Sequence, residues 1–117
     1  MSRPVGPYTP LVVAGDWLVV SGQVGQVDGK VVDGGVAAQV KQAIANLRGL
    51  LEGAGATLDD VVKTTVFLTD IADYAVMNEA YVEAFGDHRP ARSAVAVAGL
   101  PLGAAVEVEA WARRAGD

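Results

Sequence analysis

The chain has 117 residues and a mass of 12.0 kDa, and 51% of its residues are hydrophobic, which is typical of a single folded domain spanning 1–117. Nine basic and fourteen acidic residues give a net charge of -5, so neither a nucleic acid nor an anionic membrane is expected as a partner. The sequence has no cysteine and one histidine, which excludes disulfides and thiolate metal sites and argues against zinc. No apolar stretch is long enough for a membrane span or a signal-peptide core, so a cytoplasmic location is expected.

Three strands rich in valine are predicted near the start of the chain. They cover about Leu11–Val13, Trp17–Val24 and Lys30–Val32. The pair Asp28-Gly29 separates the last two strands. Because a two-residue hairpin turn needs positive φ angles at its central residues, an Asp-Gly pair there predicts a tight hairpin.

A helix is predicted over about Val36–Leu51, where apolar residues recur at the spacing of one helix face. The remaining elements are a strand, a helix and two strands, at about Val61–Leu68, Asp73–Phe85, Arg92–Ala98 and Ala105–Arg113. Asp70 or Asp73 is the candidate N-cap of the second helix, because a short carboxylate accepts a free first-turn N–H. The order β-β-β-α-β-α-β-β predicts an α+β fold with one sheet and two helices on one face.

Several predicted strands are apolar at consecutive positions, as in 17–20 and 94–97. Successive strand side chains point to opposite faces, so both faces of the sheet are expected to be apolar. Two helices cover one face only. A bare apolar face of this kind is typical of an interface, which predicts an obligate homo-oligomer.

Two positions near the C-terminus could carry chemistry. Arg92 begins an otherwise apolar strand, where its planar fork of donors could hold a small carboxylate; a surface position or a structural ion pair is the alternative. Glu107 and Glu109 alternate along the last strand and share a face with Trp111. They form either a solvated strand face or a desolvated carboxyl with a raised pKa that handles protons on a water.

Four further residues are weaker candidates. Tyr8 could clamp a ligand or anchor the chain end, and Ser21-Gly22 closes a strand where glycine permits either a close ligand or a bulge. Asn78 lies in the second helix as a pocket residue or a surface amide.

The sequence contains no phosphate-binding loop, no dinucleotide motif and no nucleophile elbow, so no nucleotide cofactor is expected. These residues alone do not define a function.

Short motifs follow one another along nearly the whole chain: Gly6-Pro7-Tyr8, Ser21-Gly22-Gln23, Ala54-Gly55, 62–70, Asn78-Glu79-Ala80-Tyr81, Pro90-Ala91-Arg92-Ser93, Leu100-Pro101 and 106–110. In this order and spacing they resemble the RidA/YjgF-type reactive-intermediate deaminases. The resemblance implies a chorismate-mutase-like fold that forms trimers, with sheets facing inward, helices outside and ligand sites between subunits. Thr9-Pro10 and Ala94 depart from residues common in that family and are expected near the pocket.

The resemblance also implies roles for the candidates. Arg92 binds the substrate carboxylate, Glu107 positions the hydrolytic water, and the pocket is lined by Tyr8, Ser21, Gly22 and Asn78. The implied reaction is the hydrolysis of 2-imino or enamine acids, such as 2-aminoacrylate, to 2-keto acids and ammonia, without metal or cofactor. The alternatives are a non-catalytic trimeric module that binds a small carboxylate or has a regulatory role, and a related enzyme acting on another small carboxylate or a carbamate-like substrate.

Overall fold

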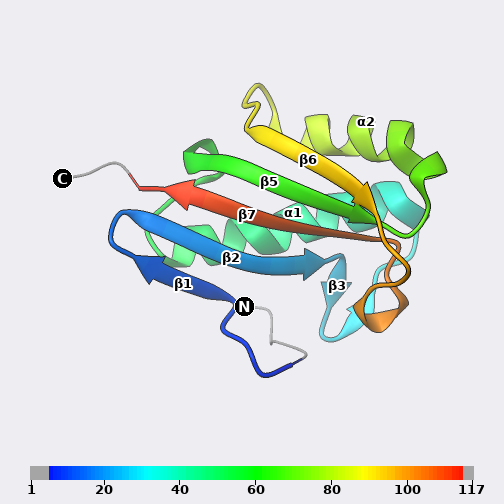
Figure 1. The fold of residues 1–117 in the computed structure, drawn as a ribbon, viewed down its shortest axis with the longest axis horizontal. Helices are drawn as coiled ribbons and strands as arrows, with labels where there is room; N and C mark the ends of the chain where they lie inside the picture. Colours follow the sequence, from blue (N-terminus) through cyan, green and yellow to red (C-terminus); the bar gives the residue numbers. More distant parts are fainter. Residues whose placement is uncertain (1–5, 115–117) are drawn as a thin grey trace.

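The computed structural model describes residues 6–114. The strands are β1 (Leu11–Ala14), β2 (Trp17–Val24), β3 (Gln26–Val27), β4 (Lys30–Val31), β5 (Val61–Leu68), β6 (Ala91–Ala96) and β7 (Val106–Arg113). The helices are α1 (Gly35–Gly53) and α2 (Tyr74–Phe85), with 3-10 turns at Leu58–Asp60, Ile71–Asp73 and Pro101–Gly103. Five strands form the main sheet in the order β1-β2-β7-β5-β6, and both helices cover one face of it (Figure 1).

The predicted α+β fold with two helices on one face of a sheet is confirmed. The expectation that every strand joins one sheet is wrong, because β3 and β4 form a separate two-stranded hairpin. The chain leaves the main sheet at Gly25, which lies so close to α1 that a Cβ there would be 2.4 Å from the carbonyl oxygen of Gln39. Asn46 of α1 then donates to the carbonyl oxygens of Val24 and Gln26, which holds the departing chain against the helix.

The hairpin turn and the start of α2 are set by local residues. Asp28 and Gly29 both have positive φ, 53° and 84°, as the sequence predicts for a tight turn. The Asp70 carboxylate accepts from the Ala72 N–H at 2.9 Å and caps the 3-10 turn that precedes α2. Asp73 directly precedes α2 but makes no side-chain cap.

The core lies between the helices and the sheet. Its largest fully buried side chains come from α1, α2 and three of the five main strands, β2, β5 and β7: Leu18, Val40, Ile44, Leu47, Leu51, Val61, Val66, Leu68, Met77, Val106 and Val108. Burying each such side chain contributes about 1.5–3 kcal/mol, so this layer holds the helices on the sheet. Neither helix within 6–114 is long and apolar enough to cross a membrane.

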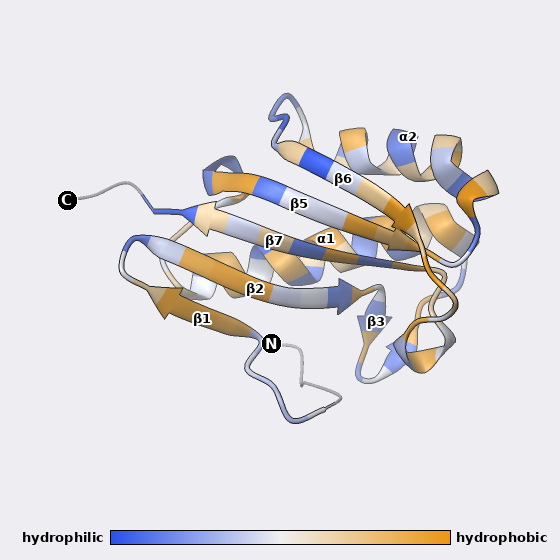
Figure 2. Cartoon of the chain, viewed as in Figure 1, coloured by the Kyte–Doolittle hydropathy of each residue, from blue (hydrophilic) through white to orange (hydrophobic). Residues whose placement is uncertain are grey.

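The other face of the sheet has no helix over it and exposes large apolar side chains. Trp17 and Trp111 are 38% and 47% exposed, and their rings meet edge to face at 6.2 Å. The register places Val12, Val19 and Trp111 side by side on this face. Figure 2 shows that β1 is hydrophobic along its length, and β2 over most of its first half. We call this surface the open face.

One buried hydrogen bond joins the sheet to α2. The hydroxyls of Thr64 and Tyr81 lie 2.7 Å apart, and both residues are buried. Tyr81→Phe is expected to lower the free energy of unfolding by about 1–3 kcal/mol, because it leaves the Thr64 hydroxyl without a partner. The double variant Thr64→Val/Tyr81→Phe should recover most of that loss in urea denaturation. A Tyr81→Phe variant as stable as the wild type would contradict this account.

Candidate active site

A shallow cleft of about 320 Å³ opens where β2 ends beside the start of β7. A register shift between Val20 and Gln23 interrupts the pairing of these strands, so the intervening Ser21 and Gly22 are displaced from the regular ladder. The cleft is lined by Tyr8, Ser21, Gly22, Pro101, Glu107 and Glu109. The structure therefore brings together five of the residues singled out in the sequence, namely Tyr8, Ser21, Gly22, Glu107 and Glu109.

Gly22 makes room for the Glu107 carboxyl group. A Cβ at Gly22 would lie 2.6 Å from Cδ and 2.9 Å from Oε1 of Glu107. These distances are shorter than Cβ atoms normally make to other atoms in proteins. The Glu107 side chain therefore lies directly against the β2 backbone. Glycine is needed here because the Glu107 side chain packs against the backbone at this position. Its place in a strand does not by itself predict this contact.

Ser21 holds the segment that carries Tyr8. Its hydroxyl donates to the Thr9 carbonyl at 2.7 Å, and its N–H donates to the Pro10 carbonyl at 2.8 Å. These bonds fix the chain beside Tyr8 against the end of β2. Thr9 and Pro10, which follow Tyr8 in the chain, themselves line a different hollow, against α1.

The Glu107 carboxyl group is half-buried, and its pKa is raised. Burial is the larger cause, because it penalises the charged form, and the neighbouring Glu109 carboxylate adds repulsion. The register pairs Glu107 with Phe67 and Glu109 with Thr65 on the open face, which confirms that both carboxylates share a face with Trp111. A glutamate in this setting is more basic than a solvated one and is suited to accept a proton from water.

Gly22→Ala is expected to lower turnover about 100-fold if Glu107 is a general base, because the added methyl group displaces its carboxylate. The free energy of unfolding should change little, since the methyl group meets the end of a flexible side chain. Gly49→Ala is the matched control, because a Cβ there meets nothing within 4 Å. Kinetics and thermal melts of both variants check this, and a fully active Gly22→Ala would show that the close approach is dispensable.

Arg92 lies on the edge strand β6 and turns toward α2. Its Nη2 donates to the Tyr74 hydroxyl at 3.0 Å, and its Nη1 approaches the Met77 sulfur at 3.7 Å. The guanidinium carbon lies 4.9 Å from the centre of the Tyr81 ring and 5.5 Å from that of Tyr74. No carboxylate within 6–114 forms an ion pair with Arg92, so the structural ion pair considered from the sequence is not found there.

Arg92 and Glu107 do not meet within one chain. The register pairs Arg92 with Thr64, which is buried toward the helices, and Glu107 with Phe67. Thr64 and Phe67 are an odd number of residues apart on β5, so they point to opposite faces of the sheet. Because paired residues share a face, Arg92 and Glu107 point to opposite faces as well, with β5 between their strands.

Asn78 belongs with Arg92 rather than with the cleft. It lies one helical turn after Tyr74 on α2, on the side of the helix that carries Tyr74 and Tyr81. Its Oδ1 atom is buried and has no hydrogen-bond partner among the described residues. A buried acceptor without a partner is costly, so a bound donor would be favoured at this atom.

Tyr74 and Pro101 belong to these two groups of residues but are absent from the sequence-based set. Pro101 lines the cleft, and Tyr74 contacts Arg92. Helical spacing in the sequence predicts an apolar stripe of Tyr74, Met77, Tyr81 and Phe85 on this helix. The last three are buried, but the prediction is wrong for Tyr74, which is 42% exposed. Its spacing from Asn78 and Tyr81 on one helix face was the signal that could have identified it.

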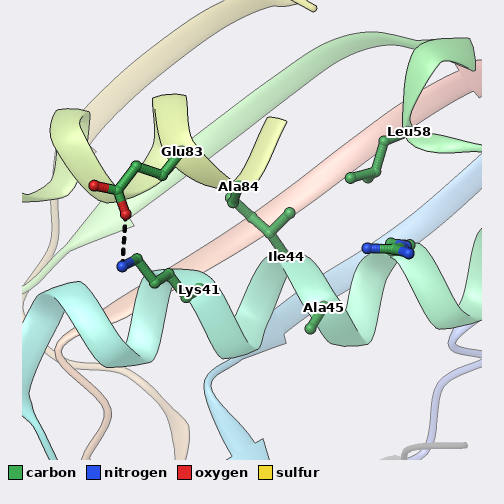
Figure 3. A pocket seen from close by; sticks show the side chains of 7 residues that line it. Lys41, Ile44, Ala45, Leu58, Glu83 and Ala84 are labelled. Carbon is green, nitrogen blue, oxygen red and sulfur yellow. Dashed lines mark ion pairs between the residues drawn. The ribbon is translucent and has the colours of Figure 1, made fainter. Parts of the chain in front are cut away.

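Two other features carry no part of this site. A second hollow of about 300 Å³ lies between α1 and α2, where Lys41 pairs with Glu83 at 2.6 Å (Figure 3). Arg48 beside it pairs with Glu52 at 3.3 Å, so both cations there already have partners. Within 6–114, no three histidine, aspartate or glutamate side chains gather as they would around a metal ion.

Comparison with known proteins identifies the family of the chain. The family model described as Endoribonuclease L-PSP matches residues 1–114, almost the whole sequence. The chain belongs to the RidA/YjgF family. This confirms the resemblance drawn from the motifs.

RidA/YjgF relatives with several names are similar to this chain. A RutC family protein from Pyrococcus abyssi is 45% identical over 113 residues, 94% of this chain and 88% of the relative. A human 2-iminobutanoate/2-iminopropanoate deaminase is 44% identical over 110 residues, 92% of this chain and 80% of the relative. The crystal structure of E. coli TdcF with bound serine has a TM-score of 0.90 at 35% identity and covers 96% of this chain and 91% of its own. The RidA/YjgF fold thus extends over nearly all of the chain.

Proposed function

We propose that this RidA/YjgF protein hydrolyses 2-imino acids, and the enamines that tautomerise to them, to 2-keto acids and ammonia. The observation that carries the proposal is the state of Arg92, a cation held by neutral groups with no carboxylate paired to it within 6–114. The name of the human relative, a 2-iminobutanoate/2-iminopropanoate deaminase, supports the same reaction.

Arg92 binds the substrate carboxylate in this proposal. A guanidinium pairs with a carboxylate through two parallel hydrogen bonds, which fix the orientation of the ligand as well as its position. The serine bound in the similar TdcF structure is a small amino acid with the same carboxylate group. Asn78, whose buried Oδ1 lacks a partner in 6–114, accepts from the substrate nitrogen.

Glu107 moves the protons. An enamine first shifts its N–H proton to C3 and becomes the imine. Glu107 then takes a proton from water as the oxygen adds to C2, and the imine nitrogen receives that proton to give a carbinolamine. Loss of the hydroxyl proton to Glu107, and its transfer to the amine, releases ammonia and the 2-keto acid. Each cycle consumes one water and returns Glu107 to its ionised form, and the raised pKa of Glu107 favours the two steps in which it accepts a proton.

The complete site takes Arg92 from one copy and Glu107 from another, because one chain directs them to opposite faces of its sheet. A homotrimer with inward sheets would bury the exposed Trp17 and Trp111 of each open face and bring copies together. Light scattering should therefore give a mass near three times 12.0 kDa. A stable monomer that retains full activity would contradict the shared site.

The reaction is tested by competition with semicarbazide, which traps imines as they form. An amino-acid oxidase generates the 2-imino acid in the presence of semicarbazide, with and without this protein. The proposal predicts that the protein suppresses semicarbazone formation while 2-keto acid and ammonia appear in equal amounts. If both small and bulky imino acids are trapped at the same rate with and without the protein, the deaminase proposal fails.

A further inference from the structure

The Arg92 side chain is held by residues of α2 that lie on one helix face. Tyr74, Met77 and Tyr81 contact its guanidinium through a hydroxyl, a sulfur and a ring. Of these contacts, the Tyr74 hydroxyl makes the shortest and most directional one, at 3.0 Å to Nη2. A free arginine side chain loses rotamer freedom when it is fixed, so a contact that fixes it before the ligand arrives favours binding.

Tyr74 is itself placed by the backbone rather than by its contact with Arg92. It is the first residue of α2, and its N–H donates to the Ile71 carbonyl at the end of the 3-10 turn. The Asp70 carboxylate stabilises that turn through the Ala72 N–H at 2.9 Å. The Tyr74 side chain therefore starts from a fixed point on a regular element, as a positioning residue requires.

The chemistry of the hydroxyl also suits this role. A carboxylate in the place of Tyr74 would neutralise the guanidinium and compete with an anionic ligand. A tyrosine hydroxyl is neutral, so it accepts one N–H and leaves the full positive charge for the ligand. The guanidinium has further N–H donors, and these remain for a bidentate carboxylate.

We propose that Tyr74 is a positioning residue, whose hydroxyl holds the Arg92 guanidinium in the orientation that receives the substrate carboxylate. This inference rests on the proposed function, in which Arg92 binds that carboxylate. It assigns Tyr74 to ligand binding, although the sequence pattern places the residue in the core. Its effect falls on the affinity for carboxylates and not on the proton transfers of Glu107.

Tyr74→Phe tests the inference, because it removes the hydroxyl and keeps the ring at Arg92. The KM for 2-iminobutanoate should rise about tenfold, the loss expected for a hydrogen bond to a charged group, while kcat stays within about twofold. In an Arg92→Ala background, Tyr74→Phe should add nothing further, since it acts through Arg92. Val76→Ala, on the exposed side of α2, is the matched control and should match the wild type.

A direct binding measurement distinguishes a failure of this inference from a failure of the proposed function. NMR titration with 2-oxobutanoate should show about tenfold weaker binding to Tyr74→Phe than to the wild type. If the wild type binds 2-oxobutanoate but hydrolyses no imine, the titration still decides the role of Tyr74. Unchanged or tighter binding by Tyr74→Phe overturns the inference and leaves the deaminase proposal standing. A wild type that neither binds 2-oxobutanoate nor hydrolyses imines overturns both.

Discussion

Arg92→Ala is expected to lower kcat/KM for small 2-imino acids about 100-fold or more, because a bidentate bond to a charged ligand is lost. Arg92→Lys should also be severely impaired, since a point charge on a flexible chain does not reproduce the planar fork. The free energy of unfolding should change by only about 1 kcal/mol, the size of a cation–π contact at a partly exposed site. Steady-state kinetics and urea denaturation of both variants measure these effects.

The control for this experiment is Arg48→Ala. Arg48 lies on α1, where it pairs with Glu52 at the surface, so its loss should leave kcat/KM unchanged. If Arg92→Ala keeps near-normal kcat/KM while its fold is intact, Arg92 does not bind the substrate. The Arg92 contacts with Tyr74 and Met77 would then serve stability alone.

Glu107→Gln is expected to lower kcat by about 10²–10⁴-fold, the contribution typical of one general base, with a much smaller change in KM. The amide keeps the size of the side chain and its place against Gly22, but it accepts no proton from water. Single-turnover rates compared with steady-state rates check that the chemical step is the one that slows. A Glu107→Gln variant with normal kcat would remove Glu107 from the mechanism.

Glu109→Gln is the matched control, two residues along the same strand and face. A general base works in its ionised form, so activity should fall as pH drops through the pKa of Glu107. That pKa is raised by burial and by the Glu109 carboxylate, so the acid limb of kcat/KM lies above the range of a solvated glutamate. Glu109→Gln removes the second cause and should shift the limb to lower pH. An unshifted limb would contradict the coupling, and a large loss of kcat would make Glu109 the base.

Much of the fold could be predicted from patterns along the chain. Helical spacing predicts α1, and the Asp28-Gly29 pair predicts the turn between β3 and β4. Strand propensity does not say which strands pair, and so the sequence did not show that this hairpin leaves the main sheet. That departure depends on a tertiary contact, the approach of Gly25 to α1, which no local pattern contains.

The candidate site also has a part that the sequence predicts and a part that depends on the tertiary structure. Alternation predicts that Glu107 and Glu109 share a face, and the register agrees. Whether Arg92 points to that face depends on the pairing of β6 with β5 and of β5 with β7, and these strands are distant in sequence. The helical spacing places Tyr74 on one face with Asn78 and Tyr81, but it does not show that this end of the stripe is exposed or that it meets Arg92.

The claim that one site draws Arg92 and Glu107 from two copies is tested most directly by mixing two inactive variants. Arg92→Ala and Glu107→Gln chains are unfolded together, refolded at equal concentration, and assayed for imine hydrolysis. In a cyclic trimer about one quarter of the sites would receive an intact Arg92 from one copy and an intact Glu107 from its neighbour. The account predicts recovery of about that fraction of wild-type activity. Mixed oligomers that remain as inactive as either parent variant would contradict it.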